Sequence, residues 1–227
     1  MKRRIRRERI LETLSGSDAD AGLKVFSRMP LGQIINALFP FFYSRDETVK
    51  WRAVTSMGIL VRDLADVDME KARNVMRRLM WNLNDESGGI GWGSPEAMGE
   101  ILARHEGLSR EYSPLLLSYV NPDANYLELP LLQRGLLWGI ARLSEERRHL
   151  VMGSKSHFFP YFKSEDPAVR GNAVRVVGLI GTAVDGPCLS PILKDKSPYT
   201  TYLDHKCITR LVGETAREAL IRLEKRI

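Results

Sequence analysis

One stretch of the chain, residues 82–96, gathers side chains whose types could do chemistry. Its sequence, NLNDESGGIGWGSPE, places two acidic residues ahead of a glycine-rich run that contains Trp92 and ends in Ser94-Pro95-Glu96. Glycine can take positive φ angles and lets the backbone come close to a partner. Ser followed by Pro predicts a helix start, with serine at the N-cap and proline at the first helical position. The free N–H groups of such a helix start could bind an anion.

As a phosphate site, however, this stretch is incomplete. It lacks the lysine of a Walker loop, no strand is predicted before it, and its carboxylates would repel a phosphate. Two interpretations stay open: a loop that presents Trp92 to a partner, and an irregular turn that orients one helix and buries Trp92. In the first interpretation the contact residues are Asp85, Glu86, Gly88, Gly89, Gly91, Trp92, Gly93, Ser94 and Glu96.

Two further stretches, residues 121–130 and 196–210, carry aromatic side chains between predicted helices. Their sequences are NPDANYLELP and KSPYTTYLDHKCITR. Aromatic residues on loops suit a protein-binding edge. We therefore expect binding contacts from Tyr126, Tyr199 and Tyr202.

The histidines and cysteines do not form a pattern typical of a metal site. Asp204, His205 and Cys207 have the right side-chain types, but no second ligand pair accompanies them. Cys188 and Cys207 could pair only if the fold brings them together. Because no export signal is recognisable, we expect reduced thiols, a cytoplasmic location and no cofactor.

The basic charge of the chain is concentrated at its N-terminus. The formal net charge is +6, and residues 2–9, with six basic and one acidic side chain, contribute +5 of it. This segment, Lys2–Arg9, could attract nucleic acid or anionic lipid. Alternatively it is the solvated face of a first helix that turns four apolar residues inward, namely Ile5, Ile10, Leu11 and Leu14. No apolar run reaches 18 residues, so we expect no membrane span.

The elements that must position these residues follow a period of about forty residues. Residues 38–61 and 158–181 align without a gap at an offset of 120, and nine of their twenty-four positions are identical. A small residue also recurs at intervals of 41, 40, 39 and 41, as Gly58, Gly99, Gly139, Gly178 and Ala219. Such regularity indicates an internal repeat.

Each repeat is predicted to contain two helices. The first is short and apolar and often contains a proline, and a turn with an aspartate follows. The second has apolar residues at three- and four-residue spacing, such as Val49, Ala53, Val54, Met57 and Leu60. Glycine inside a helix costs about 1 kcal/mol relative to alanine. Its recurrence therefore predicts that neighbouring second helices approach closely.

These features resemble the HEAT-like repeats of phycobilisome-lyase-type and related helical-repeat proteins. The best matches run from Asp166 through Gly181 and from Asp46 through Gly58. The resemblance implies an all-α fold, a right-handed α-α superhelix (solenoid) of about five helix pairs over residues 30–227. Residues 1–29 would be basic capping helices, since such arrays need covered ends, and the whole would form a single domain.

Two helical-repeat enzymes can be compared with these residues. Deoxyhypusine hydroxylase takes iron ligands from repeated His-Glu pairs, and this sequence has a single such pair at His105-Glu106. A HEAT-like DNA alkylation-repair glycosylase would hold a charged base against aromatic rings and use an acidic side chain. Trp92, Glu96 and Asp85 would take these roles, but the nearly neutral repeat body argues against a DNA groove.

The sequence therefore favours a non-catalytic scaffold or adaptor over an enzyme. An α-solenoid offers a protein or peptide an extended concave face, which the second helices line. We expect the partner to contact this face and the loop at residues 84–96. The glycosylase stays the alternative, and charge separates the two: a DNA reader needs a positive concave face, whereas a scaffold can carry a mixed one.

Overall fold

The computed structural model describes residues 2–16, 25–26, 29–84 and 91–225. In chain order the elements, with η marking a 3-10 helix, are α1 (Lys2–Ser15), α3 (Leu31–Leu38), η1 (Phe39–Tyr43), α4 (Glu47–Val67), α5 (Met69–Leu83), α6 (Ser94–Arg104), α7 (Glu106–Ser118), α8 (Pro130–Val151), η2 (Met152–Lys163), α9 (Pro167–Ile180), η3 (Ala183–Asp185), α10 (Gly186–Leu189), η4 (Ser190–Lys194), β1 (Pro198–Leu203), β2 (Lys206–Leu211) and α11 (Val212–Glu224). Within these ranges no helix is long and apolar enough to cross a membrane.

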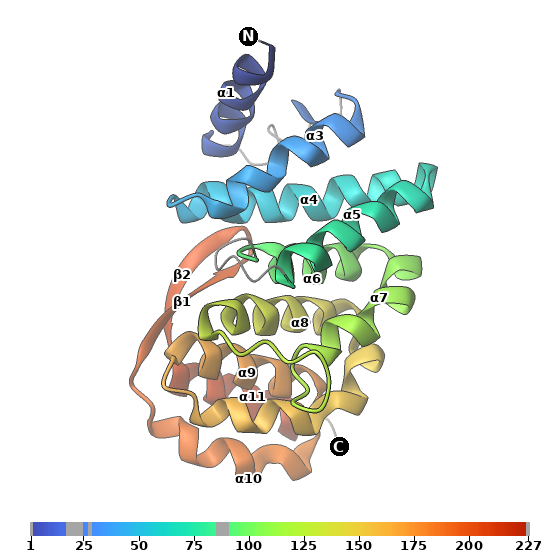
Figure 1. Cartoon of the computed structure of the whole chain (residues 1–227). Coiled ribbons are helices and arrows are strands. Elements are labelled where there is room, and N and C mark those ends of the chain that lie inside the picture. The colour runs from blue at the N-terminus through green and yellow to red at the C-terminus, as the bar shows by residue number, and fades with distance from the viewer. Residues whose placement is uncertain (1, 17–24, 27–28, 85–90, 226–227) are drawn as a thin grey trace.

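The helices stack in two layers, which Figure 1 shows from the side. The inner layer is the row α4, α6, α8, α9 and α11, in which each helix packs on the next. The outer layer holds α3 with η1, then α5, α7, η2 and α10, and each of these packs on the inner helix that follows it in the chain. One outer element and one inner helix therefore make one repeat, and the predicted all-α solenoid of helix pairs is confirmed.

The turns between outer and inner elements explain why certain residues are identical in the two segments that align best, residues 38–61 and 158–181. The Asp46 carboxylate accepts hydrogen bonds from the N–H groups two and three residues ahead, at 2.8 and 3.3 Å. Asp166 does the same at 2.9 and 3.4 Å. Ser44 and Ser164 each accept a bond at 3.2 Å from the N–H of the aspartate two residues later. Both inner helices thus begin with the same N-cap.

The recurring small residues lie where inner helices touch, as predicted. A Cβ atom on Gly99 would overlap the backbone of Gly139, so α6 and α8 meet backbone to backbone. A Cβ on Gly178 would lie 2.6 Å from the Cβ of Ala219, and one on Gly58 would lie 2.5 Å from a side-chain carbon of α6. The spacing of about forty residues therefore marks one contact point repeated along the stack.

At the N-terminal end, α1 packs on α3 and α4. Ile10 and Leu14 are buried, because residues four apart share one helix face. Leu11 was expected to face inward too, but it is 44% exposed, since adjacent residues point about 100° apart around a helix. Arg52 of α4 donates from Nη1 to the carbonyl of Leu14 at 2.8 Å and so holds the end of α1. The side chain of Ile5 lies outside the described residues.

A β-hairpin interrupts the helical pattern before α11, in the stretch predicted as a loop at residues 196–210. β1 and β2 pair antiparallel, from Pro198 opposite Leu211 to Leu203 opposite Lys206. Asp204 and His205 form the two-residue turn, with φ of 48° and 62°. Positive φ at both positions is the geometry that a tight hairpin requires. Threonine in both strands, tyrosine in β1 and isoleucine in β2 favour extended backbone.

Candidate binding site on the inner face

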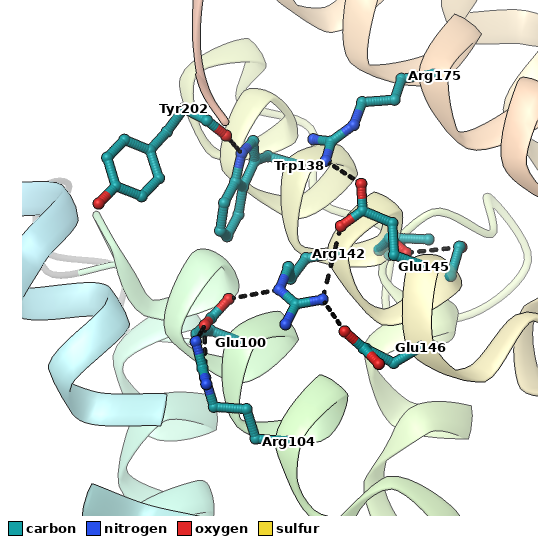
Figure 2. A network of polar contacts seen from close by, with 10 residues as sticks. Glu100, Arg104, Trp138, Arg142, Glu145, Glu146, Arg175 and Tyr202 are labelled. Atoms are coloured by element: carbon teal, nitrogen blue, oxygen red, sulfur yellow. Dashed lines mark hydrogen bonds and ion pairs between the residues drawn. The ribbon is translucent and has the colours of Figure 1, made fainter. Parts of the chain in front are cut away.

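The β-hairpin lies across the inner face of the helix stack. In Figure 1 it runs along one side, from the level of α10 to α4, and its strands contact α9, α11 and α4. The Tyr202 ring stacks on the Trp51 ring of α4, with centroids 4.9 Å apart and planes at 1°. Trp138 of α8 donates from its indole Nε1 to the Tyr202 carbonyl at 2.7 Å, as Figure 2 shows. The hairpin thus joins the last repeat to α4.

The base of the hairpin is anchored to α9 and α11. The Tyr199 hydroxyl lies 2.8 Å from Oγ1 of Thr215, and its ring covers Gly171, where a Cβ would overlap it. Burial raises the pKa of the Tyr199 hydroxyl, which keeps it a neutral hydrogen-bonding group. Arg170 donates from Nε to Asp195 at 2.8 Å, just ahead of β1. The hairpin is therefore fixed at both ends.

Between the hairpin and the inner helices lies a cavity of about 590 Å³, which we call the tryptophan pocket. This size is within the range of ordinary ligand sites. Its walls come from α4, the start of α6, α8, the start of α9 and both strands. The lining residues are Glu47, Lys50, Trp51, Glu96, Leu131, Arg134, Gly135, Trp138, Asp166, Pro167, Ala168, Asn172, Pro198, Tyr199, Thr200, Thr201 and Thr209.

Glu96 is a buried carboxylate in this pocket. It stands in the first turn of α6 and is only 5% exposed. Its carboxylate lies directly over Gly135 of α8, where any Cβ would overlap it. The nearest cation is Lys50, whose Nζ is 3.6 Å from Oε1, and no described residue donates a hydrogen bond to the carboxylate. The absence of a side chain at position 135 is therefore what makes room for Glu96.

Other charges of the pocket already have close partners. Arg134 donates from Nε to Oδ2 of Asp166 at 2.5 Å, and Oδ1 of the same aspartate caps α9. The Glu47 carboxylate accepts a hydrogen bond from the Trp51 indole at 3.0 Å. A basic residue of one inner helix thus pairs with the turn aspartate that caps the next inner helix.

Past the hairpin, the inner face carries a dense network of ion pairs, drawn in Figure 2. Glu100, 3% exposed, accepts from Arg104 at 2.6 Å and from Arg142 at 3.0 Å. Arg142 also bonds a glutamate one turn further along α8 at 2.9 Å, and Arg175 of α9 donates to Glu145 at 2.6 Å. Burial acts to lower the pKa of Arg142, but the carboxylates around it raise this pKa overall. The inner face is therefore mixed in charge here, and Arg104, Arg142 and Arg175 are paired with carboxylates.

The glycine-rich loop is described from residue 91 onward, so Asp85, Glu86, Gly88 and Gly89 lie outside the described residues. Gly91 packs against a leucine of α8, and Gly93, with φ of 75°, packs against Phe42. Ser94 is buried and is the first residue of α6, so its prediction as N-cap is wrong by one position, and Gly93 occupies the cap. The reason is that the left-handed backbone at Gly93 ends the loop directly before the helix.

The aromatic residues singled out from the sequence are placed in different surroundings. Trp92 is 42% exposed, which agrees with a loop that presents it, but it does not line the tryptophan pocket. Tyr126 is 37% exposed, and its hydroxyl accepts a bond from Gln133 at 3.2 Å. Tyr199 and Tyr202 were expected on an exposed edge and are instead 5% and 6% exposed, because they hold the hairpin on the inner face. The structure therefore gathers Glu96 and Tyr199 in one pocket and leaves Trp92 and Tyr126 outside it.

Sequence reasoning missed the residues that build the pocket around Glu96. Trp51, Lys50 and Gly135 were not singled out as site residues. A usable signal exists: Gly135 is a second glycine, one helical turn before the repeat glycine Gly139. A glycine that the repeat contact does not require indicates that something else occupies its space.

The tip of the hairpin does not form a metal site. Asp204 and His205 make the turn, and among the described residues no group of three histidine, cysteine, aspartate or glutamate side chains could hold a metal ion. Cys188 and Cys207 are both exposed and unpaired with each other. Cys188 lies in α10 and Cys207 in β2, so the fold does not bring the two thiols together as a disulfide.

Comparison of the sequence with known proteins does not assign the chain to a family. No protein-family model matches the chain. An uncharacterized protein of Archaeoglobus fulgidus is 35% identical over 83 residues, which is 35% of this chain and 42% of that relative. The match thus spans less than half of the relative's length.

Comparison of structures is more informative about the fold. A designed armadillo repeat protein has a TM-score of 0.50 at 16% identity, over 95% of this chain and 98% of that one. Another, solved in complex with the peptide (KR)4, has a TM-score of 0.52 at 15% identity over the same shares. An archaeal HEAT-like repeats protein from Thermococcus onnurineus NA1 scores 0.43 at 12% identity, over 97% and 81%. These likenesses do not distinguish the phycobilisome-lyase type. The two matches to designed armadillo repeat proteins, together with the helix pairs above, show that this chain has a HEAT/armadillo-like helical-repeat fold.

Proposed function

We propose that this chain is a non-catalytic adaptor that binds an extended segment of a partner protein in the tryptophan pocket. One observation carries the proposal: a cavity of about 590 Å³ on the inner face combines two tryptophans, a buried carboxylate and a strand edge. Ligand sites typically join apolar walls to a few placed polar groups. Tryptophan is also among the residues that contribute most at protein interfaces.

The edge of β1 supports the idea of an extended ligand. The two-residue turn makes Leu203 and Lys206 a hydrogen-bonded pair, so every second pair along the hairpin is bonded as well. The backbone groups of Thr200 and Tyr202 therefore point away from β2. The bond from Trp138 to the Tyr202 carbonyl agrees with this direction. Thr200 lines the pocket, so its N–H and C=O are available to pair with an added strand.

The exposed loop tryptophan gives the partner a second contact. Trp92 is 42% exposed and is held between Gly91 and Gly93, whose packing fixes the end of the loop. Trp92 lies two residues before α6, the helix that carries Glu96. We propose that a partner segment longer than the pocket also contacts this indole.

The charge pattern supports a protein partner over DNA. Arg134, Arg142, Arg170 and Arg175 of the inner helices are each paired with a carboxylate at 3.0 Å or less. A DNA groove would require free cations there. The glycosylase alternative also needs Trp92 beside Glu96, and Trp92 is not among the residues that line the pocket. The basic segment Lys2–Arg9 is the remaining route to nucleic acid.

The fold comparison is consistent with this proposal. A designed armadillo repeat protein of the same overall fold was solved in complex with a peptide. At 15% identity the likeness concerns the fold, so the binding role of this chain rests on its own pocket.

The proposal is tested by selecting from a displayed library of random octapeptides on the immobilised chain. We expect enriched peptides that bind with a Kd of about 1–100 µM in isothermal titration calorimetry, as is usual for short linear segments. Thr200→Pro removes the N–H that faces the pocket and should weaken binding about tenfold or more. Cys207→Pro is the matched control, because Cys207 stands opposite Tyr202 on β2, its N–H faces the other edge of the hairpin, and it does not line the pocket.

Two results would contradict the proposal. The first is a negative peptide result: either no peptide is enriched, or the Thr200→Pro and Cys207→Pro variants bind the enriched peptides equally. The second is tight, steeply salt-dependent binding of duplex DNA that persists after residues 2–9 are deleted, since this would place a nucleic-acid site on the repeats themselves.

A further inference from the structure

We infer that the tryptophan pocket recognises a basic side chain, lysine or arginine, on the bound segment, with its cation placed at the carboxylate of Glu96. This inference rests on the proposed function and names the chemistry of the partner. Three independent features of the pocket lead to it: its unbalanced carboxylates, its aromatic wall and the lysine that already occupies it.

The carboxylates of the pocket outnumber its cations. Asp166 is neutralised by Arg134 at 2.5 Å. Glu47 and Glu96 then share the single ammonium of Lys50, which lies 3.8 Å from the first and 3.6 Å from the second. Both distances are too long for a hydrogen bond. One negative charge is therefore left for a ligand to neutralise.

Glu96 in particular receives no hydrogen bond from the described residues, although a buried carboxylate needs such bonds. Its side chain is 7% exposed, and none of the described residues donates a bond to it. A buried charge without such bonds is costly, and a donor supplied by a ligand would recover that cost. Because Glu96 lines the pocket, its oxygens face the space that a ligand would enter.

The walls of the pocket suit a long basic side chain. Nζ of Lys50 lies 5.2 Å from the centre of the Trp51 ring, so a cation already makes the aromatic contact proposed for the ligand. Trp138, Leu131 and Pro167 provide apolar surface for the methylene stem of lysine or arginine. Lys50 therefore acts as an internal substitute that a ligand cation would displace or join.

An acidic or phosphorylated segment fits the same pocket poorly. Arg134 is engaged by Asp166, and Lys50 is shared by two glutamates. A ligand anion would face the carboxylate of Glu96, and both cations among the lining residues, Lys50 and Arg134, are already engaged by carboxylates. Like charges in a water-poor site repel strongly.

The test repeats the octapeptide selection with the wild-type chain and with Glu96→Gln. We expect peptides enriched on the wild-type chain to share a lysine or arginine at one position, and peptides enriched on Glu96→Gln to lose that preference. The best lysine peptide and its norleucine analogue are then compared by calorimetry. The norleucine peptide should bind the wild-type chain with a Kd about tenfold or more above that of the lysine peptide. On Glu96→Gln the Kd values of the two peptides should agree within about twofold.

A second variant predicts the opposite change and guards against loss of structure in the first. Lys50→Met removes the internal cation that competes for Glu96, so the lysine peptide should bind several-fold more tightly than to the wild-type chain. Lys155→Met is the control for total charge, because Lys155 pairs with Asp185 away from the pocket. It should leave the affinity unchanged within about twofold.

The outcomes separate this inference from the proposed function. Enriched peptides without a shared basic residue, if their binding is still sensitive to Thr200→Pro, would overturn the basic side chain and keep the peptide site. Equal binding of the lysine and norleucine peptides to the wild-type chain would also overturn the basic side chain and keep the peptide site. Failure to enrich any peptide would overturn both.

Discussion

At the residue scale, neighbouring repeats pack backbone to backbone where a glycine of one meets a glycine of the next. Gly99 and Gly139 leave no room for a Cβ between α6 and α8. Gly99→Ala should therefore force the two helices apart and lower the free energy of unfolding by about 1–3 kcal/mol, the usual cost of overpacking. Urea denaturation followed by circular dichroism measures this change.

Gly32 supplies the control for that substitution. It lies in α3, and a Cβ there would have nothing within 4 Å. Gly32→Ala should leave stability unchanged or raise it by up to about 1 kcal/mol, because alanine favours a helix more than glycine does. Equal losses in the two alanine variants would show that helix contact is not the reason for the recurring glycines.

Asp185 gives a prediction for the effect of pH. Burial acts to raise the pKa of its carboxyl, but hydrogen bonds from Lys155 and from the N–H of Thr182 lower it below the ordinary 3.8. A lowered pKa in the folded state means stability that is present above the unfolded value and is lost as pH falls through the folded value. Asp185→Asn should cost about 1–3 kcal/mol at pH 7.

The stability difference between wild type and Asp185→Asn should shrink when the pH is lowered below about 4. There the carboxyl of the unfolded wild-type chain becomes protonated first, and that of the folded chain follows at lower pH. Unfolding of the two proteins by urea at pH 7, 5, 4 and 3 measures it. A gap between wild type and variant that stays constant over this range would show that the charge of Asp185 contributes nothing.

At the element scale, the hairpin depends on contacts made by one aromatic side chain. Tyr202 stacks on Trp51, and its backbone carbonyl accepts the Trp138 indole. Tyr202→Ala should release residues 198–211 and increase their hydrogen exchange about tenfold or more, while the helical circular dichroism stays near that of the wild type. Tyr126→Ala is the matched control, and exchange in the hairpin should not respond to it.

The repeats could be predicted from the sequence because their determinants are local and periodic. The cap at Asp46 involves neighbours in the chain, and it recurs in the same form at Asp166. The small residues recur because each repeat makes the same contact. Glu96 was named as a candidate because of its glycine-rich neighbourhood, whereas Lys50 and Gly135, which lie against it in the structure, were not.

The hairpin and the pocket could not be predicted in the same way, because they depend on contacts between distant residues. Tyr202 is held by Trp51, about 150 residues earlier, and by Trp138. Nothing in the stretch at residues 196–210 reports on those partners, and its Asp-His turn is not a common hairpin signal. Only the extra glycine at position 135 hinted that α8 receives a side chain from α6.

At the scale of the whole molecule, the hairpin adds a long-range contact to a fold that usually lacks one. In a simple helical-repeat array each repeat touches its neighbours, so the ends can unfold separately. Here the segment before α11 contacts α4 directly. We expect α4 and α11 to become exposed to hydrogen exchange at the same urea concentration.

Replacing residues 198–211 with a short glycine-serine linker should uncouple the two ends. In that variant α11 should exchange at a lower urea concentration than α4, while the wild-type chain shows one transition in mass-spectrometric exchange. Coincident transitions in the variant would mean that neighbour-to-neighbour packing alone provides the cooperativity.

The stacking of Tyr202 on Trp51 also has a consequence for how this chain can change in evolution or by design. Helical-repeat proteins commonly vary in copy number, because a unit can be inserted or removed without disturbing the others. An extra helix pair between α4 and α11 would shift Tyr202 by about 10 Å, one interhelical spacing, and leave it without Trp51. The hairpin has a fixed length of six residues per strand. Its fixed length therefore allows only one number of repeats between its contacts with α4 and with α11 if both contacts are to be kept.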